Sequence, residues 1–169
     1  MGKAVWKPGT VLYPVPAVMV SCGTMEEKNI ITVAWTGTVN SDPAMTYISV
    51  RPGRHSYGLI EQTGEFVINL VTEQLAYACD WCGVKSGRDV DKFQEMRLTA
   101  QKGEKVSAPI IRESPVNIEC RVRQLLPLGS HHLLGLAEAE FFPALDVIIL
   151  RLPLEAAGAD AHEGQPVPV

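Results

Sequence analysis

Hydrophobic and polar side chains alternate along several short segments of this chain. From Ile30 to Thr36, bulky residues occupy every second position, and small or polar residues occupy the positions between them. A period of two is that of a half-buried β-strand. This pattern, together with β-branched residues, predicts strands at residues 15–21, 30–36, 44–50, 65–71, 116–124 and 131–140.

The predicted strand at residues 116–124 has the most regular pattern. Its apolar set is expected to face the core, and its polar set is expected to face solvent. Six strands rich in β-branched residues favour a barrel or a sandwich over a parallel sheet. The apolar set is Val116, Ile118, Cys120 and Val122, and the polar set is Asn117, Glu119, Arg121 and Arg123.

Helical signals are confined to three short segments. Ser56 precedes residues 57–62, which Gly64 ends, and Thr72 is a candidate cap for residues 73–82, which Gly83 ends. Ser86 and Asp89 have the spacing of a capping box before a third helix at residues 90–96. The prediction is a mainly β domain with a few short helices on its surface.

The composition indicates one globular domain and excludes several classes of protein. A chain of 169 residues, 46% hydrophobic and 20% charged, can bury one sizeable core. Its net charge of −4 offers no basic face for nucleic acid. It carries neither a signal-like start nor an apolar run of the roughly 20 residues that a membrane helix needs, so we expect a cytoplasmic protein that does not bind membranes. Ala, Gly and Pro dominate the end, which predicts a domain at residues 1–153 and a loosely packed tail at 154–169.

The predicted strand at residues 30–36 ends in a loop that is rich in polar side chains. Gly37 permits close backbone approach, and hydroxyl and amide side chains around it offer donors and acceptors to a planar polar ligand. The alternative is a loop whose Asn-Ser-Asp-Pro sequence only makes a turn. The polar side chains are Thr36, Thr38, Asn40 and Ser41.

Two basic stretches each coincide with a predicted helix start. Arg51, Arg54 and Ser56 precede or begin one helix, and residues 85–92 surround the start of another. Free N–H groups at a helix start, with cations and hydroxyls beside them, suit a phosphate. The alternative is a pair of solvated basic turns, and whether the two stretches meet is left open by the sequence.

Four cysteines and two adjacent histidines give weaker signals. Cys79 and Cys82 have the spacing of a redox dithiol, but with Leu75 they also form one stripe of a buried helix face. We favour the buried stripe and reduced thiols, since a cytoplasmic chain of this size rarely relies on disulfides. No metal site is expected, because no second pair of thiols is present. His131 and His132 would point to opposite faces of a strand.

Eight motifs occur in order between Lys3 and Glu140. Together they closely resemble the flavin reductase-like, FMN-binding split-barrel family and, within it, the flavoredoxin branch. The motifs are Trp6-Lys-Pro-Gly, Tyr13-Pro, Ile31-Thr-Val-Ala-Trp-Thr-Gly-Thr, Ser41-Asp-Pro, Tyr47-Ile-Ser-Val-Arg-Pro, Gly64-Glu-Phe-Val-Ile-Asn69, Ser86-Gly-Arg-Asp-Val-Asp-Lys-Phe93 and Ser114-Pro-Val-Asn-Ile-Glu-Cys120.

The resemblance implies a six-stranded Greek-key split barrel with a few short helices, binding one FMN per subunit at the interface of a homodimer. It places Trp35 to Ser41 along the isoalloxazine, the two basic stretches near the ribityl phosphate, and His131 near the flavin edge. No catalytic acid or base is assigned. The predicted cofactor-binding residues are Thr32, Trp35, Thr36, Gly37, Thr38, Asn40, Ser41, Arg51, Arg54, Ser56, Tyr57, Ser86, Arg88, Lys92 and His131.

The resemblance leaves three functions open. The first is a flavin or ferric reductase that takes electrons from NADH or NADPH. The second is an electron carrier that exchanges electrons with a redox protein such as a ferredoxin, and the third is a flavin-binding module without turnover. The resemblance stops near Phe141, beyond which only His162-Glu163-Gly164 matches the family's closing segment, and residues 147–152 are predicted to form one further strand.

Overall fold

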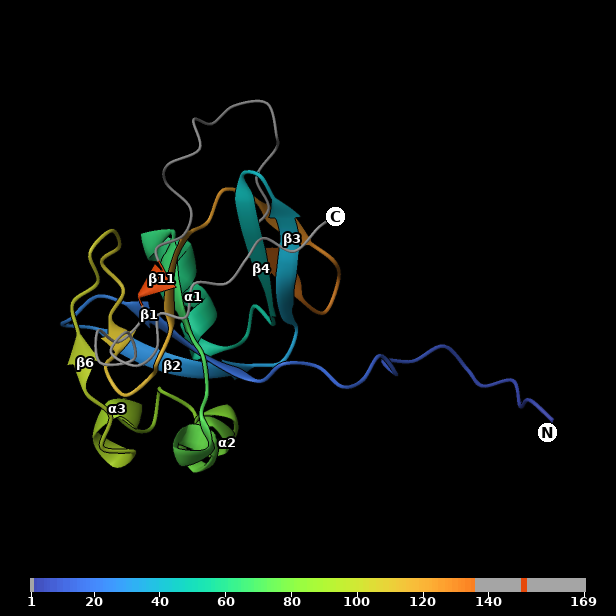
Figure 1. Ribbon diagram of the computed structural model, residues 1–169, viewed down its shortest axis with the longest axis horizontal. Helices are drawn as coiled ribbons and strands as arrows, with labels where there is room; N and C mark the ends of the chain where they lie inside the picture. The colour runs from blue at the N-terminus through green and yellow to red at the C-terminus, as the bar shows by residue number, and fades with distance from the viewer. Residues whose placement is uncertain (1, 136–149, 152–169) are drawn as a thin grey trace, which may run out of the picture.

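The computed structural model describes residues 2–135 and 150–151, and β-strands dominate this part of the chain (Figure 1). The larger sheet has the strand order β11-β8-β5-β1-β2, and the second has the order β3-β4-β10-β9. Neighbouring strands in both sheets are antiparallel. The strands are β1 (Val18–Gly23), β2 (Lys28–Val33), β3 (Thr36–Ser41), β4 (Ala44–Val50), β5 (Glu65–Asn69), β8 (Asn117–Arg121), β9 (Leu125–Pro127), β10 (His132–Leu134) and β11 (Leu150–Arg151), with a separate pair β6 (Ala100–Gln101) and β7 (Ile110–Ile111).

Short helices cover both faces of the larger sheet. They are α1 (His55–Thr63), the 3-10 turn η1 (Glu73–Leu75), α2 (Ala76–Val84) and α3 (Lys92–Glu95). On one face, Val20 of β1 packs with Ile48 of β4 and Ile60 of α1 in the main core. On the other face, Met19 belongs to a second cluster with residues of α2 and α3. Figure 1 shows α2 and α3 on the side of β2 opposite the β3–β4 hairpin.

The predicted mainly β fold class is confirmed, although the described residues divide into more and shorter strands than six. The strand at residues 44–50 has the predicted bounds, and β11 lies inside the predicted segment 147–152. The predicted tail at 154–169 lies outside the described residues, as do all of residues 136–149 and residues 152–153.

The loop predicted after residue 36 is wrong, because Thr36–Ser41 forms the edge strand β3. It pairs with β4, and side chains support the pairing: Thr36 Oγ1 donates to the Tyr47 carbonyl at 2.6 Å, and Thr46 Oγ1 donates to the Gly37 carbonyl at 2.9 Å. An edge strand with little burial lacks the apolar alternation by which strands are found in a sequence. Its polar composition therefore concealed it.

Helix starts were also predicted imperfectly. Helix α1 begins after Arg54, so Ser56 is its second residue rather than its cap. The side chain of Thr72 makes no capping bond, and α2 continues through Gly83 to Val84. The cap of α3 is Asp91, which accepts hydrogen bonds from the N–H groups of Phe93 and Gln94. The capping box predicted for Ser86 and Asp89 is therefore wrong.

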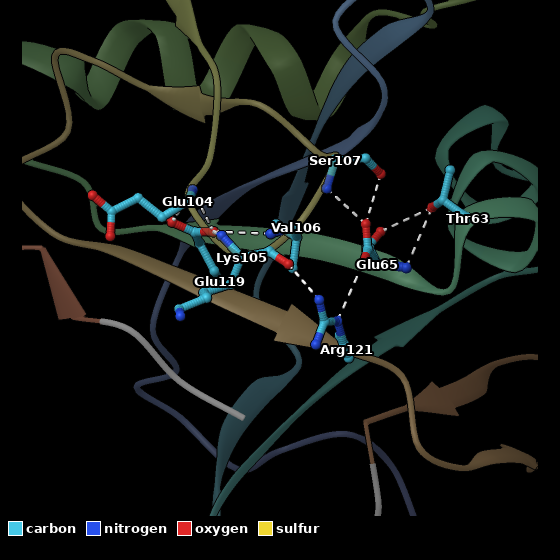
Figure 2. A network of polar contacts seen from close by, with 8 residues as sticks. All are labelled: Thr63, Glu65, Glu104, Lys105, Val106, Ser107, Glu119 and Arg121. Atoms are coloured by element: carbon cyan, nitrogen blue, oxygen red, sulfur yellow. Dashed lines mark hydrogen bonds and ion pairs between the residues drawn. The ribbon is translucent and has the colours of Figure 1, made fainter. Parts of the chain in front are cut away.

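The polar face of β8 is covered rather than exposed, which corrects a further prediction. Asn117 and Glu119 are only 4% and 3% exposed. The Glu119 carboxylate accepts hydrogen bonds from the N–H groups of Glu104, Lys105 and Val106 at 2.7 to 3.2 Å. Figure 2 shows this loop lying over the strand, with Glu65 bonded to Ser107 beside it. A loop distant in the sequence thus buries the face that alternation assigned to solvent.

Within residues 2–135 and 150–151, no helix has the length and apolar character needed to cross a membrane.

Candidate functional site

The two basic stretches of the sequence meet at one cavity of about 230 Å³. Strand β2, the start of α1 and the segment between α2 and α3 form its walls. Five predicted cofactor-binding residues are therefore brought together, although the two stretches lie some 30 positions apart. They are Arg54, Ser56, Ser86, Arg88 and Lys92, and Asn29, Lys85 and Gly87 line the cavity with them.

The charge of this cavity differs from that of the whole chain. Two arginines and two lysines line it, and no aspartate or glutamate does, whereas the chain carries a net charge of −4. Helix α1 begins at the cavity, its cap Arg54 makes no side-chain capping bond, and its first turn holds no acidic residue. A helix start among several cations favours an anionic group.

Asn29 is a residue of this cavity that the sequence did not reveal. It is 3% exposed, and its Nδ2 donates a hydrogen bond to Oγ of Ser56 at 2.8 Å. Ser56 is itself 1% exposed. An asparagine at the beginning of a strand is ordinary turn composition, so no local pattern distinguished it.

Lys92 lines the cavity although it is only 4% exposed. Its Nζ donates to the carbonyl oxygens of Ile30 and Cys82, at 2.7 Å each. Burial lowers the pKa of Lys92, yet two charge-assisted bonds hold the ammonium in place. Lys92 thereby joins α3 to β2 and α2 while adding positive potential to the cavity.

A second cavity of about 170 Å³ adjoins the first, because Ile31 and Arg54 line both. Its walls include Trp35, Arg51 and His131. The Trp35 and His131 rings lie with their centroids 4.4 Å apart and their planes tilted by 46°. Arg51, predicted with the phosphate group, lines this second cavity and not the first.

His131 is held as an acceptor. Nε of Arg51 donates to its Nε2 at 3.4 Å, and its Nδ1 lies 3.0 Å from Oγ of Ser130. Burial, followed by the charges of Arg51 and Arg54, lowers the pKa of His131. The lowered pKa favours the neutral imidazole, and a neutral ring that accepts at Nε2 carries its proton on Nδ1.

The remaining predicted residues are not all gathered at the two cavities. Thr32 lines the second cavity while its hydroxyl donates to the Cys79 carbonyl. Tyr57 is buried in the core, with its hydroxyl 2.7 Å from Nδ1 of His132. Asn40 donates to the carbonyls of the Asp42-Pro43 turn. With Thr36, Gly37, Thr38 and Ser41 it lies on β3, outside both cavities.

The cysteines are buried and free, as predicted. Cys79 and Cys82 belong with Leu75 to the second core cluster. Burial raises the pKa of Cys82 to about 11 and also raises that of Cys79. In the described part of the chain, no group of three or more His, Cys, Asp or Glu side chains is placed to hold a metal ion.

Comparisons with known proteins gave matches to both the sequence and the fold. The sequence model of the flavin reductase like domain matches residues 10–137. An uncharacterized protein of Archaeoglobus fulgidus is 30% identical over 72% of this chain and 68% of its own length. An NADH-dependent FMN reductase of Streptomyces nodosus subsp. asukaensis is 26% identical over 78% of this chain and 70% of its own.

The fold is similar to that of a solved flavoredoxin of Desulfovibrio vulgaris (Miyazaki F). The two structures superimpose with a TM-score of 0.77 and 26% sequence identity. The match covers 92% of this chain and 78% of the flavoredoxin.

Proposed function

The chain belongs to the flavin reductase-like family, and from this premise we propose that it binds FMN as a homodimer and transfers electrons from NADH or NADPH through it. The names of three similar proteins state a flavin-linked redox role: an NADPH-flavin oxidoreductase, an NADH-dependent FMN reductase and a flavoredoxin. We propose specifically that the flavin is FMN, that NADH or NADPH is the electron donor and that two copies of the chain form the dimer.

The observation that carries the proposal is the meeting of two basic stretches at one carboxylate-free cavity. A flavin phosphate carries roughly −1.5 to −2 charges, and Arg54, Arg88 and Ser86 line the cavity with donors that suit it. Gly87 leaves a space there that the amide of Asn29 enters. The residues present therefore fit a phosphate.

The second cavity can hold the isoalloxazine ring of the same FMN molecule. Since it shares Ile31 and Arg54 with the first, one elongated molecule can occupy both. Trp35 and His131 provide a ring surface on which a planar group can pack. In this arrangement the phosphate lies by α1 and the ring lies towards Trp35.

A bound flavin supplies the capacity to accept a hydride and to release electrons singly or in pairs. The protein supplies position and charge: Arg54 and the start of α1 hold the phosphate, and neutral His131 is oriented by Arg51. We assign no side chain the role of catalytic acid or base.

A second candidate function is that of an electron carrier that accepts electrons from a redox protein. The structural similarity to a flavoredoxin favours it. The two functions use the same flavin site and differ in the donor that reduces it.

The test is to purify the protein, identify its flavin, and follow bleaching of flavin absorbance on adding NADH, NADPH or a reduced ferredoxin. Steady-state oxidation of NADH or NADPH with added FMN would support the reductase. Bleaching by reduced ferredoxin alone would support the carrier. A protein that binds no flavin, or whose flavin none of the three donors reduces, would contradict the redox proposal.

A further inference from the structure

Asn29 lies between the two halves of the basic cavity. On one side, its Nδ2 donates to Oγ of Ser56 in α1 at 2.8 Å. On the other side, its amide occupies the space beside Gly87: a Cβ on Gly87 would lie 2.1 Å from Oδ1, 2.5 Å from Cγ and 2.8 Å from Nδ2 of Asn29. A Cβ this close would force the buried Asn29 amide to move, so the asparagine side chain and not the backbone of Gly87 disfavours a larger residue there.

The place of Asn29 in the sheet leaves its side chain little freedom. Its backbone pairs with Cys22 of β1, and the residue is 3% exposed. A buried amide is costly unless it is hydrogen-bonded, and Ser56 provides that partner. Because Asn29 donates this bond, the serine keeps its own hydroxyl proton for another acceptor. The amide thus fixes the orientation of a hydroxyl that lines the cavity.

We propose that Asn29 is the positioning residue of the phosphate site, holding Ser56 and the Ser86–Arg88 loop in register so that both basic stretches act on one phosphate. The inference rests on the proposed function, because it concerns the site where the FMN phosphate is held. The inference makes Asn29 a determinant of specificity: the preference for FMN over riboflavin depends on its uncharged amide.

The first experiment measures the dissociation constants of FMN and riboflavin for the apoprotein. Asn29→Ala removes the hydrogen bond that orients Ser56, so it should weaken FMN by up to about tenfold, the upper range for the net contribution of one hydrogen bond, and should change riboflavin little. Asn29→Asp keeps the shape and places a carboxylate among the cations, so it should weaken FMN further and again spare riboflavin. Thermal unfolding of each apoprotein identifies any variant that does not fold.

The second experiment is a double-mutant cycle with Gly87. Gly87→Ala should weaken FMN more than tenfold in the natural background, because its Cβ meets the Asn29 amide. In the Asn29→Ala background, the same change should cause almost no further loss, because the obstructing amide is gone. Gly58→Ala is the matched control, since a Cβ there meets nothing within 4 Å, and it should act alike in both backgrounds.

Three outcomes overturn the inference. Equal loss of FMN and riboflavin in Asn29→Ala would mean that the residue supports the fold alone. An unchanged FMN to riboflavin ratio in Asn29→Asp would place the amide away from the phosphate. If Gly87→Ala had equal effects in both backgrounds, Gly87 and Asn29 would not be coupled in FMN binding. If the unmodified protein itself binds FMN no more tightly than riboflavin, the phosphate proposal fails instead, so the two failures are distinguishable.

Discussion

Nε of Arg51 donates a hydrogen bond to Nε2 of His131, 3.4 Å away, and so joins the turn before α1 to the segment before β10. The contact requires a neutral imidazole, because a protonated ring has no acceptor. Burial lowers the pKa of His131, and the charges of Arg51 and Arg54 lower it further.

This relationship predicts how stability depends on pH. Since the folded state lowers the pKa of His131, the unfolded state binds more protons, and stability falls as the pH drops through the ordinary histidine range near 6.5. His131→Gln should remove this part of the loss. Denaturant unfolding from pH 8 to pH 5 measures the free energy of unfolding of the natural protein and of the His131→Gln variant, and the difference between them gives the contribution of His131. A difference that does not vary with pH would contradict the assignment.

Charge reversal at Arg54 should discriminate between flavins. Arg54→Glu replaces a donor shared by both cavities with a carboxylate, so FMN should bind 10- to 100-fold more weakly, the range for bonds to charged groups. Riboflavin, which lacks the phosphate, should be affected far less. Arg112→Glu, an exposed arginine outside both cavities, is the control with the same change in net charge. An unchanged FMN to riboflavin ratio in Arg54→Glu would remove Arg54 from the site.

We expect a homodimer whose interface includes the N-terminal arm, residues 2–17. Figure 1 shows this arm extended away from the sheets, and its Trp6 and Leu12 are 79% and 86% exposed. Large exposed apolar side chains commonly mark an interaction surface. Leu12→Ser should raise the dimer dissociation constant at least tenfold, whereas Tyr77→Ser, a change at the exposed surface of α2, should not. Sedimentation equilibrium would measure both, and a flavin-bound monomer at micromolar concentration would contradict the dimer.

The cysteine pair should be dispensable for flavin reduction. With the pKa of Cys82 raised to about 11 and that of Cys79 raised as well, neither thiol ionises appreciably at pH 7. The double variant Cys79→Ala, Cys82→Ala should bind and reduce flavin normally, with a loss of unfolding free energy of about 1 kcal/mol per residue. Stopped-flow reduction tests this. A variant that binds flavin normally and cannot be reduced would restore the dithiol interpretation.

We propose that residues 1–153 carry the flavin-binding domain. The residues beyond Leu154 hold little apolar mass to offset the entropy of ordering. A stop codon after Leu154 should therefore leave flavin affinity and dimerisation within about twofold of the full chain. Titration with flavin and light scattering measure the two quantities. A loss of either beyond tenfold would assign the tail a structural role.

The sequence by itself determined the elements whose buried face can be seen as a regular pattern of apolar residues along the chain. The strand at residues 44–50 was found with its correct bounds because one of its faces packs on the core and the pattern records that face. The types of side chain around Arg54 and Arg88 led to the hypothesis of a phosphate site, since cations and hydroxyls at a helix start suit an anionic group. Strand β3 could not be predicted in this way, because its mostly polar sequence shows no apolar alternation.

Only the tertiary structure decided which distant residues meet. Nothing in the local pattern places Ser56 beside Asn29, because that contact depends on how α1 packs on the larger sheet. Likewise, alternation predicted that Glu119 faces solvent. In the structure the loop at residues 104–106 covers Glu119, and its N–H groups donate hydrogen bonds to the carboxylate. The two basic stretches became one site because α1 and the segment after α2 both pack beside β2. Alternation records which face of an element is apolar, whereas the partner of a buried polar group is set by packing between elements far apart in the chain.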